Sequence, residues 1–181
     1  MLSSTSKHRV FVGLPISEKL QKEIFEWEKQ FSRLPVRWLR PENFHITLVP
    51  PFYADNEEIE KLGNILEELT GFGSFAVEFE KVTFGPRPLQ PRLIWAEGET
   101  PQKLLDLQQK IDQILGRVPE KRPLKLHLTL ARFRPESFSS FEIQKLDEKI
   151  AWADEIKELA LFESKLSRDG ASYQIIREIS L

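Results

Sequence analysis

Histidine occurs only three times in the 181 residues of this chain, and two of the three begin the same phrase. "HITL" starts at His45 and "HLTL" starts at His127, in two stretches whose composition is typical of strands. Because side chains alternate between the two faces of a strand, the histidine and threonine of each phrase share one face. The aliphatic residues share the other face and are expected to anchor each strand in a core. In the expected fold, each of the two strands therefore buries its aliphatic face and leaves its His–Thr face free.

The alternative is that the repetition is chance. Threonine is a favoured strand residue, and a single histidine on a strand is usually a hydrogen-bonded structural group. From background residue frequencies, the chance that a particular histidine begins such a phrase is on the order of one in several hundred. Its presence at two of three histidines favours a shared site over two unrelated core strands.

Composition excludes several functional classes. Apolar residues make up 40% of the chain and charged residues 30%, which is typical of a folded domain rather than of a disordered one. The net charge of −2 excludes a protein that binds polyanions through a generally basic surface. Any contact with nucleic acid must therefore be local. The absence of cysteine excludes disulfides, thiolate metal sites and cysteine nucleophiles. With no signal peptide and no apolar run of about 18 residues, we expect a cytoplasmic protein without a membrane partner.

The order of the expected elements predicts one α+β domain over residues 1–181. Strands that follow one another directly suggest antiparallel sheets with helices packed outside. Pro50 and Pro51 are expected to end the strand before them, because proline cannot donate to a ladder. The expected strands cover 9–15, 36–40, 44–50, 75–84, 93–98, 125–133, 156–166 and 172–181, with a hairpin turn at 168–170.

Four helices are expected between these strands. Ser17 is a candidate N-cap for the first helix. Asp55 and Glu58 have the spacing of a capping box at the start of the second. Thr100 followed by proline indicates the start of the third, with threonine as the N-cap. A fourth helix is expected over about 139–150.

Two histidines and two threonines suit phosphodiester chemistry. A histidine pair can supply one general base and one general acid near neutral pH. Threonine hydroxyls can donate to the non-bridging phosphate oxygens, where charge collects in the transition state. Zinc needs three or four protein ligands, so a zinc site would require distant carboxylates in addition to the histidines. The chain has no HExxH, G-x-S-x-G, P-loop or G-x-G-x-x-G phrase, and phosphodiester cleavage without a metal or cofactor fits it best.

Four stretches also carry a resemblance to a known family. They are "RVFVGLP", "VRWLRPENFHITLVPPF", "KLHLTLARFR" and "SKLSRDGASYQIIREI". With its two His-x-Thr-x motifs, the chain resembles the two-histidine (2H) phosphoesterase superfamily, and within it the RNA 2′,3′-cyclic phosphodiesterases, also called 2′-5′ RNA ligases. It departs from that family after the first motif, where "VPPFYADNEE" replaces a Phe-x-Gly-type phrase.

The resemblance implies a bilobal, pseudo-two-fold 2H phosphoesterase fold with antiparallel sheets facing a central cleft. It implies His45 as the proton donor, His127 as the proton acceptor, and Thr47 and Thr129 as the groups that hold the phosphate oxygens. The family pattern also favours a phosphate contact for Arg132. In a regular strand Arg132 would lie on the opposite face from Thr129, so this contact requires a twist or a bulge, and a surface salt bridge is the alternative.

The implied reaction is metal-independent hydrolysis of RNA or nucleotide 2′,3′-cyclic phosphates to 2′-phosphomonoesters. Its reverse would join a cyclic phosphate end to a 5′-hydroxyl in a 2′-5′ linkage. The expected partners are RNA ends or small cyclic nucleotides, the expected state is a monomer, and no cofactor is expected. The alternative function is an RNA- or nucleotide-binding module without turnover. Candidate base-stacking residues are Phe11, Trp38, Phe52 and Tyr173, and His8 is expected to be a solvated residue.

Overall fold

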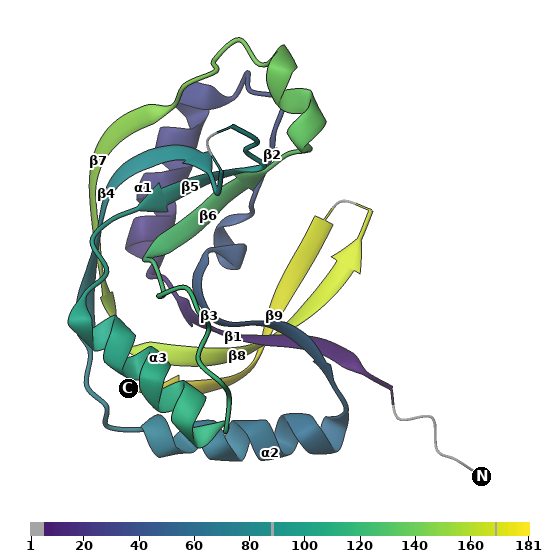
Figure 1. Ribbon diagram of the computed structural model, residues 1–181, viewed down its shortest axis with the longest axis vertical. Coiled ribbons are helices and arrows are strands. Elements are labelled where there is room, and N and C mark those ends of the chain that lie inside the picture. Colours follow the sequence, from purple (N-terminus) through teal and green to yellow (C-terminus); the bar gives the residue numbers. More distant parts are fainter. Residues whose placement is uncertain (1–5, 88, 169) are drawn as a thin grey trace.

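The structure is a computed structural model that describes residues 6–87, 89–168 and 170–181, and these residues form two antiparallel sheets (Figure 1). Nine strands are described: β1 (His8–Pro15), β2 (Arg37–Trp38), β3 (His45–Ala54), β4 (Phe75–Gly85), β5 (Leu93–Glu97), β6 (His127–Arg132), β7 (Asp147–Ile156), β8 (Glu158–Ser167) and β9 (Gly170–Ser180). The described α-helices are α1 (Glu18–Glu28), α2 (Asn56–Leu66) and α3 (Gln102–Ile114). Short 3₁₀ turns η1 to η4 cover Lys29–Phe31, Pro41–Asn43, Glu67–Leu69 and Pro135–Ser140.

Each sheet carries one of the two His–Thr phrases. The four-stranded sheet has the order β3-β1-β8-β9, and the five-stranded sheet has the order β2-β6-β5-β4-β7. The first phrase lies in β3 and the second in β6. Only Lys157 separates β7 from β8, so the chain passes from one sheet to the other without a loop. The expected α+β class with antiparallel sheets is confirmed.

Two of the expected helix starts are confirmed by their capping contacts. The Ser17 side chain accepts a hydrogen bond from the Leu20 backbone N–H at 3.2 Å. Asp55 and Glu58 form the reciprocal capping box at 2.9 and 2.8 Å. The expected N-cap at Thr100 is wrong: α3 begins after Pro101, and the Thr100 hydroxyl instead accepts from the Leu126 backbone N–H at 2.9 Å. That bond ties the start of α3 to the residue before β6.

The expectation that Pro50 and Pro51 end their strand is also wrong, because β3 continues to Ala54. Two features of the sheet accommodate the prolines. β3 is an edge strand, so one of its sides has no neighbouring strand. A proline on that side leaves no carbonyl of a neighbouring strand without a donor. The register moves from Val10–Phe52 to Val12–Val49, which sets the two prolines opposite Phe11 alone, in a bulge.

The fourth expected helix, over 139–150, is replaced by η4 and the beginning of β7. β7 pairs with β4 along most of its length and buries Trp152 and Ile156. β7 therefore covers an edge of β4 that would otherwise be unpaired. This pairing overrides the helical pattern of the local sequence. The last two strands are found as expected, and the turn between them includes Asp169, which lies outside the described residues.

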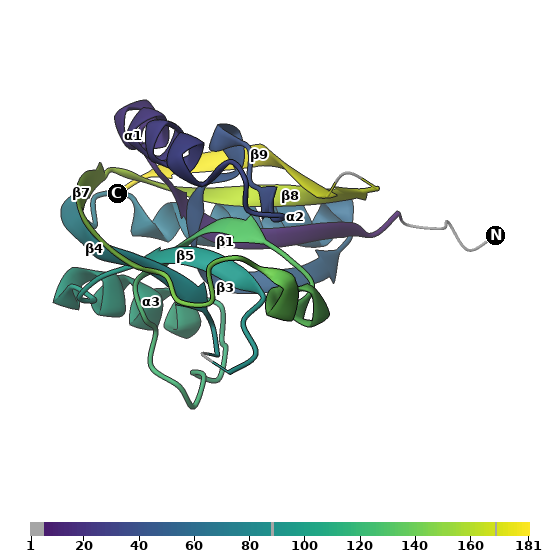
Figure 2. The ribbon, with the colours of Figure 1, turned by 90° about the horizontal axis from the view of Figure 1, so that it is seen from above.

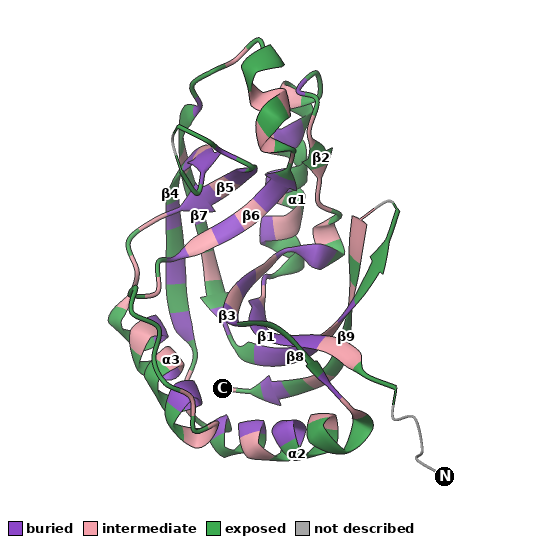
Figure 3. Cartoon of the chain, turned by 45° about the vertical axis from the view of Figure 1, so that its right-hand side comes forward, coloured by how far each residue is buried: buried purple, intermediate pink, exposed green. Residues whose placement is uncertain are grey.

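The three helices lie at the periphery of the sheets. Figure 2 shows α1 on one side of the strands and α3 on the other. In Figure 3 buried and exposed segments alternate along α2 and α3, as expected for helices that lay one face on the core. Arg177 of β9 holds α2 with a 2.9 Å hydrogen bond to the Asn64 side chain. None of the helices in the described part of the chain is long and apolar enough to cross a bilayer.

Glu28 at the end of α1 is a buried carboxylate. It is 8% exposed, its Oε1 atom has no hydrogen-bond partner among the described residues, and burial raises its pKa to about 8. Between its unfolded pKa of 4.5 and about 8, the folded state binds the proton more tightly than the unfolded state does. This carboxylate therefore lowers stability as pH rises through that window.

Glu28→Gln is expected to remove this penalty. At pH 4 the variant should nearly match the wild type, because the wild-type carboxyl is then mostly protonated in both the folded and the unfolded state. At pH 8.5 it should be more stable by about 1–3 kcal/mol, the usual cost of a buried polar group without a partner. Urea unfolding of both proteins at the two pH values measures the difference. An equal difference at both pH values would show that the carboxylate charge is not its cause.

Candidate active site

The alternation expected for the first phrase is present in β3. Ile46 and Leu48 are buried at 0% and 4% exposure, whereas His45 and Thr47 stay partly exposed on the other face. Pairing with β1 sets Thr47 opposite Gly13. The aliphatic residues thus fix the strand in the core and leave the imidazole and the hydroxyl side by side.

The second phrase has the same arrangement in β6. Leu128 and Leu130 are fully buried, and His127 and Thr129 are half-buried on the opposite face. Thr129 is the register partner of Trp95 in β5. Each sheet therefore presents one imidazole and one hydroxyl on the same face of one strand.

Both imidazoles are oriented by a backbone carbonyl two residues earlier. Nδ1 of His45 lies 2.7 Å from the Asn43 carbonyl oxygen, and Nδ1 of His127 lies 2.8 Å from the Lys125 carbonyl oxygen. A carbonyl only accepts, so each Nδ1 carries the proton, and each Nε2 accepts in the neutral ring or donates in the protonated one. Nε2 of His45 lies 3.1 Å from the Thr47 hydroxyl. The two halves of the site thus share the contact between Nδ1 and a backbone carbonyl.

Asn43 supplies the carbonyl that orients His45, and no sequence pattern indicated this role. Its side chain donates to the Ala171 carbonyl at 3.0 Å and accepts from the Tyr173 backbone N–H at 3.1 Å. Asn43 is 5% exposed, so these two bonds are shielded from water. They lock the last residue of η2 onto β9 and thereby hold the ring of His45.

Aromatic rings surround His45. The ring centroid of Phe11 lies 4.7 Å from the imidazole, and that of Tyr173 lies 5.1 Å away with its edge toward it. A Cβ atom on Gly13 would stand 2.9 Å from the Ile46 carbonyl and 3.3 Å from the His45 ring, so this ring needs glycine beneath it. Glycine inside a strand is a recognised sign of close approach and is the signal by which Gly13 could have been found.

His127 has its own supporting residues in the five-stranded sheet. The Trp95 ring lies 4.9 Å from the imidazole, and the Lys125 ammonium lies over the same indole. Lys125 also binds the nearly buried Glu97 carboxylate at 2.6 Å, and Lys81 binds its other oxygen at 3.0 Å. These contacts come from neighbouring strands and are invisible in the sequence.

The electrostatics place both histidines and Arg132 at one site. Burial lowers the pKa of His45 to about 4, the hydrogen bond to Asn43 opposes this, and the charges of Arg132 and His127 lower it further. Burial also lowers the pKa of His127. The hydrogen bond to the Lys125 carbonyl and the charge of Glu97 oppose this, and the charges of Lys125 and Arg132 lower it further. In the absence of an anion, His45 is therefore neutral at pH 7, and the neutral form of His127 predominates.

The bulge that a phosphate contact of Arg132 requires is present in β6. Ile94 pairs with Ala131 and Trp95 pairs with Thr129, so Leu130 is an extra residue in β6. Beyond this point the alternation is shifted by one, and Arg132 shares the face of His127 and Thr129. Leu130 and Ala131 are accordingly both buried.

Thr47 and His127 line the same cavity of about 580 Å³, which extends below α3 and the 115–124 loop. One of these residues comes from each sheet, so the two His–Thr faces open onto a common space. Arg132 and Tyr173 line a second hollow of about 150 Å³ next to His45. Of the five expected site residues, Thr47 and His127 thus line the first hollow and Arg132 lines the second, whereas His45 and Thr129 line neither of these two.

The other expectations on single residues have mixed outcomes. Phe11 is 1% exposed and packs on His45, so it is not free to stack on a base. Phe52 lines a separate hollow with residues of α2, whereas Trp38 and Tyr173 line the hollow next to His45. The expectation that His8 is only solvated is wrong, because it belongs to β1 and its Nδ1 lies 2.7 Å from the Glu163 carboxylate.

Within residues 6–87, 89–168 and 170–181, no group of three histidine, aspartate or glutamate side chains is close enough to hold a metal ion. The predicted site residues supply two imidazoles, two hydroxyls and a guanidinium.

Comparison with known proteins gives consistent matches. The family model described as "LigT like Phosphoesterase" matches residues 14–95. An RNA 2′,3′-cyclic phosphodiesterase of Bacillus subtilis is 34% identical over 128 residues, which cover 67% of this chain and 69% of the relative. An RNA 2′,3′-cyclic phosphodiesterase of Archaeoglobus fulgidus is 26% identical over 175 residues, covering 93% of this chain and 98% of the relative.

Solved structures share the fold over nearly the whole chain. E. coli LigT complexed with 3′-AMP superposes with a TM-score of 0.78 at 19% identity, covering 97% of this chain and 99% of that one. E. coli LigT complexed with phosphate gives a TM-score of 0.73 at 18% identity, covering 97% and 98%. At this level of identity the similarity establishes the bilobal architecture alone.

Proposed function

This chain belongs to the family of LigT-like phosphoesterases, and on that basis we propose that it hydrolyses RNA or nucleotide 2′,3′-cyclic phosphates to 2′-phosphomonoesters. The observation that carries the proposal is the cavity that Thr47 and His127 share across the two sheets, with His45 and Arg132 in electrostatic reach. The names of the curated relatives support the same substrate class. One chain supplies every proposed group, so we propose that it acts as a monomer.

In the proposed reaction His127 is the general base. His127 lines the cavity of about 580 Å³, which leaves room for a water molecule. His127 takes a proton from this water while the water oxygen forms a bond to phosphorus. The hydrogen bond from Nδ1 to the Lys125 carbonyl holds the tautomer that leaves Nε2 free to accept.

His45 is the proposed general acid. As the bond between phosphorus and O3′ breaks, protonated Nε2 of His45 gives its proton to O3′, and a 2′-phosphomonoester remains. The Thr47 and Thr129 hydroxyls donate to the non-bridging oxygens, and the Arg132 guanidinium balances their growing charge. Strain in the five-membered cyclic ester lowers the barrier, so the proposed reaction proceeds without a metal ion.

The low pKa of His45 has two consequences for this role. A weakly basic imidazole is a strong acid once protonated and therefore an effective donor to an alkoxide. It is also mostly neutral at pH 7 in the free protein, since burial lowers its pKa to about 4. A bound anionic cyclic phosphate favours the charged form and raises this pKa, so the substrate itself promotes protonation of its acid.

The pH dependence of kcat/KM for adenosine 2′,3′-cyclic phosphate, measured in EDTA, tests the proposal. In the active form of the histidine pair, His45 is protonated and His127 is neutral. Above the pKa values of both histidines the population of this form falls roughly tenfold per pH unit. Because the pKa of His127 is lowered from 6.5, the decline should already be under way at pH 7. Absence of turnover, loss of turnover in EDTA, or a rate that rises from pH 7 to 9 would each contradict the proposal.

A further inference from the structure

Exposed arginines gather at the edge of the five-stranded sheet, beside the site. Arg37 of β2 is the register partner of Arg132 in β6, and Arg92 precedes Leu93, which also pairs with Arg132. Like charges directly opposite each other in a ladder are destabilising. In the described part of the chain none of these three arginines, nor Arg40, forms an ion pair with a carboxylate. Because the whole chain has a net charge of −2, a general excess of base does not explain the cluster.

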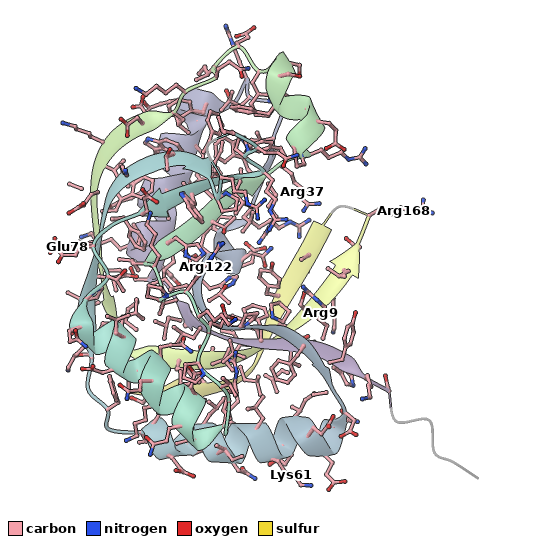
Figure 4. The ribbon with its side chains drawn as sticks, in the orientation of Figure 1. Arg9, Arg37, Lys61, Glu78, Arg122 and Arg168 are labelled. Atoms are coloured by element: carbon pink, nitrogen blue, oxygen red, sulfur yellow. The ribbon has the colours of Figure 1, made fainter. Side chains whose placement is uncertain are left out.

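These side chains line one continuous groove. The 150 Å³ hollow next to His45 is lined by Arg37, Arg40 and Arg132, and the adjoining hollow is lined by Arg37, Arg92, Arg132 and Arg134. Since two arginines belong to both hollows, we call the five together the arginine groove. Figure 4 shows Arg37 at the opening between the sheets, next to the β8–β9 hairpin. A Cβ atom on Gly170 would stand 3.0 Å from its guanidinium, so the hairpin approaches the groove closely.

The groove begins where the proposed reaction puts the terminal ribose. If His45 protonates O3′, that ribose lies on the His45 side of the phosphate. Tyr173 and Asn43 both contact His45, and both line the hollow that Arg37 and Arg40 share. The nucleotide chain that precedes the terminal ribose therefore has to leave the site along this side.

Resting on the proposed function, we propose that the arginine groove binds the phosphodiester immediately upstream of the terminal cyclic phosphate. The preferred substrate is then an oligonucleotide end rather than a mononucleotide. Guanidinium groups suit this contact because they bind phosphate oxygens in pairs and remain charged. A bound phosphate also offsets the repulsion between Arg37 and Arg132.

The test compares two substrates, adenosine 2′,3′-cyclic phosphate and a hexanucleotide that ends in the same group. The measured quantity is the ratio of kcat/KM for the hexanucleotide to kcat/KM for the mononucleotide. Wild type should show a ratio well above one. Arg37→Gln and Arg40→Gln should each lower this ratio about tenfold, the loss expected for one charged contact. Lys61→Gln is the matched control, because Lys61 lies on α2, away from the groove, and its loss should leave the ratio unchanged (Figure 4).

Salt dependence supplies a second readout that a structural role would not change. Each phosphate contact on a single strand contributes a slope of about −0.7 to the plot of log kcat/KM against log salt. The wild-type slope should be steeper for the hexanucleotide than for the mononucleotide, and Arg37→Gln should reduce that difference. Arg37→Lys, which keeps the charge, should retain most of it.

The outcomes separate this proposal from the proposed function. A wild-type ratio near one, or a ratio that Arg37→Gln and Arg40→Gln leave unchanged, overturns the groove. If wild type turns over neither substrate, the proposed function fails. The proposed role of the groove is then tested by measuring, by fluorescence anisotropy, the affinity for a labelled hexanucleotide that ends in a 3′-phosphate. Weaker binding by both variants, with no change in Lys61→Gln, supports the groove, and equal binding by all four proteins overturns it.

Discussion

Replacing His45 or His127 by alanine is expected to lower kcat/KM for adenosine 2′,3′-cyclic phosphate about 10³-fold. A positioned general acid or base typically contributes about 10²–10⁴-fold, and both are needed in the same step of the proposed reaction. The double variant should therefore be little worse than either single variant, because groups that act as a unit lose their effect together. Steady-state kinetics with a fluorimetric or chromatographic product assay measures all three.

His8→Ala is the matched control for these variants. His8 is the third histidine of the chain, and its contact with Glu163 joins β1 to β8 away from the two cavities. Its loss should leave kcat/KM within about twofold of wild type. Activity that persists in His45→Ala or His127→Ala at more than about a tenth of the wild-type value would contradict the acid–base assignment.

The same variants separate the acid from the base. A phosphodiester with p-nitrophenolate as the leaving group needs no proton at that oxygen, so the general acid is dispensable for it. His45→Ala should therefore lose far less activity on this substrate than on the cyclic phosphate, whereas His127→Ala should remain impaired on both. The opposite pattern would exchange the proposed roles of the two histidines.

Thr47→Val and Thr129→Val are each expected to lower kcat about 10²-fold with a smaller change in KM. Each variant keeps the shape of the side chain and removes one hydroxyl donor to the non-bridging oxygens, where a lost donor typically costs about 10²–10³-fold. Thr47→Val also removes the hydroxyl that lies 3.1 Å from Nε2 of His45. Thr47→Ser and Thr129→Ser restore the hydroxyl and should recover most of the rate.

Thr70→Val provides the comparison for these variants. Thr70 is exposed at the end of η3, and it lies in neither hollow of the candidate site. This variant should retain full activity. If the valine variants of Thr47 and Thr129 also retain it, the threonines serve strand packing and do not hold the phosphate.

The part of the site that follows from local alternation could be predicted from the sequence. In a strand the period of two fixes which side chains share a face, so "HITL" and "HLTL" were sufficient to put each histidine beside its threonine. The capping contacts of Ser17 and Asp55 were predictable for the same reason, since each partner lies within three residues.

Features that depend on a distant strand could not be predicted in this way. Asn43 positions His45 through bonds to β9, and Trp95 supports His127 from β5. The orientation of Arg132 depends on one extra residue in β6, which appears only when the register with β5 is known. The expected end of β3 at Pro50 failed similarly, because an edge position and a bulge tolerate a proline that a central strand would not.

The most direct test of the proposed mechanism is the identity of the product from adenosine 2′,3′-cyclic phosphate. ³¹P NMR of a reaction run to completion in EDTA distinguishes the two phosphomonoesters. With water activated by His127 and O3′ protonated by His45, the product should be adenosine 2′-phosphate alone, and no product should form with His45→Ala over the same time. Formation of adenosine 3′-phosphate, or an unchanged cyclic phosphate with wild-type protein, would contradict the account.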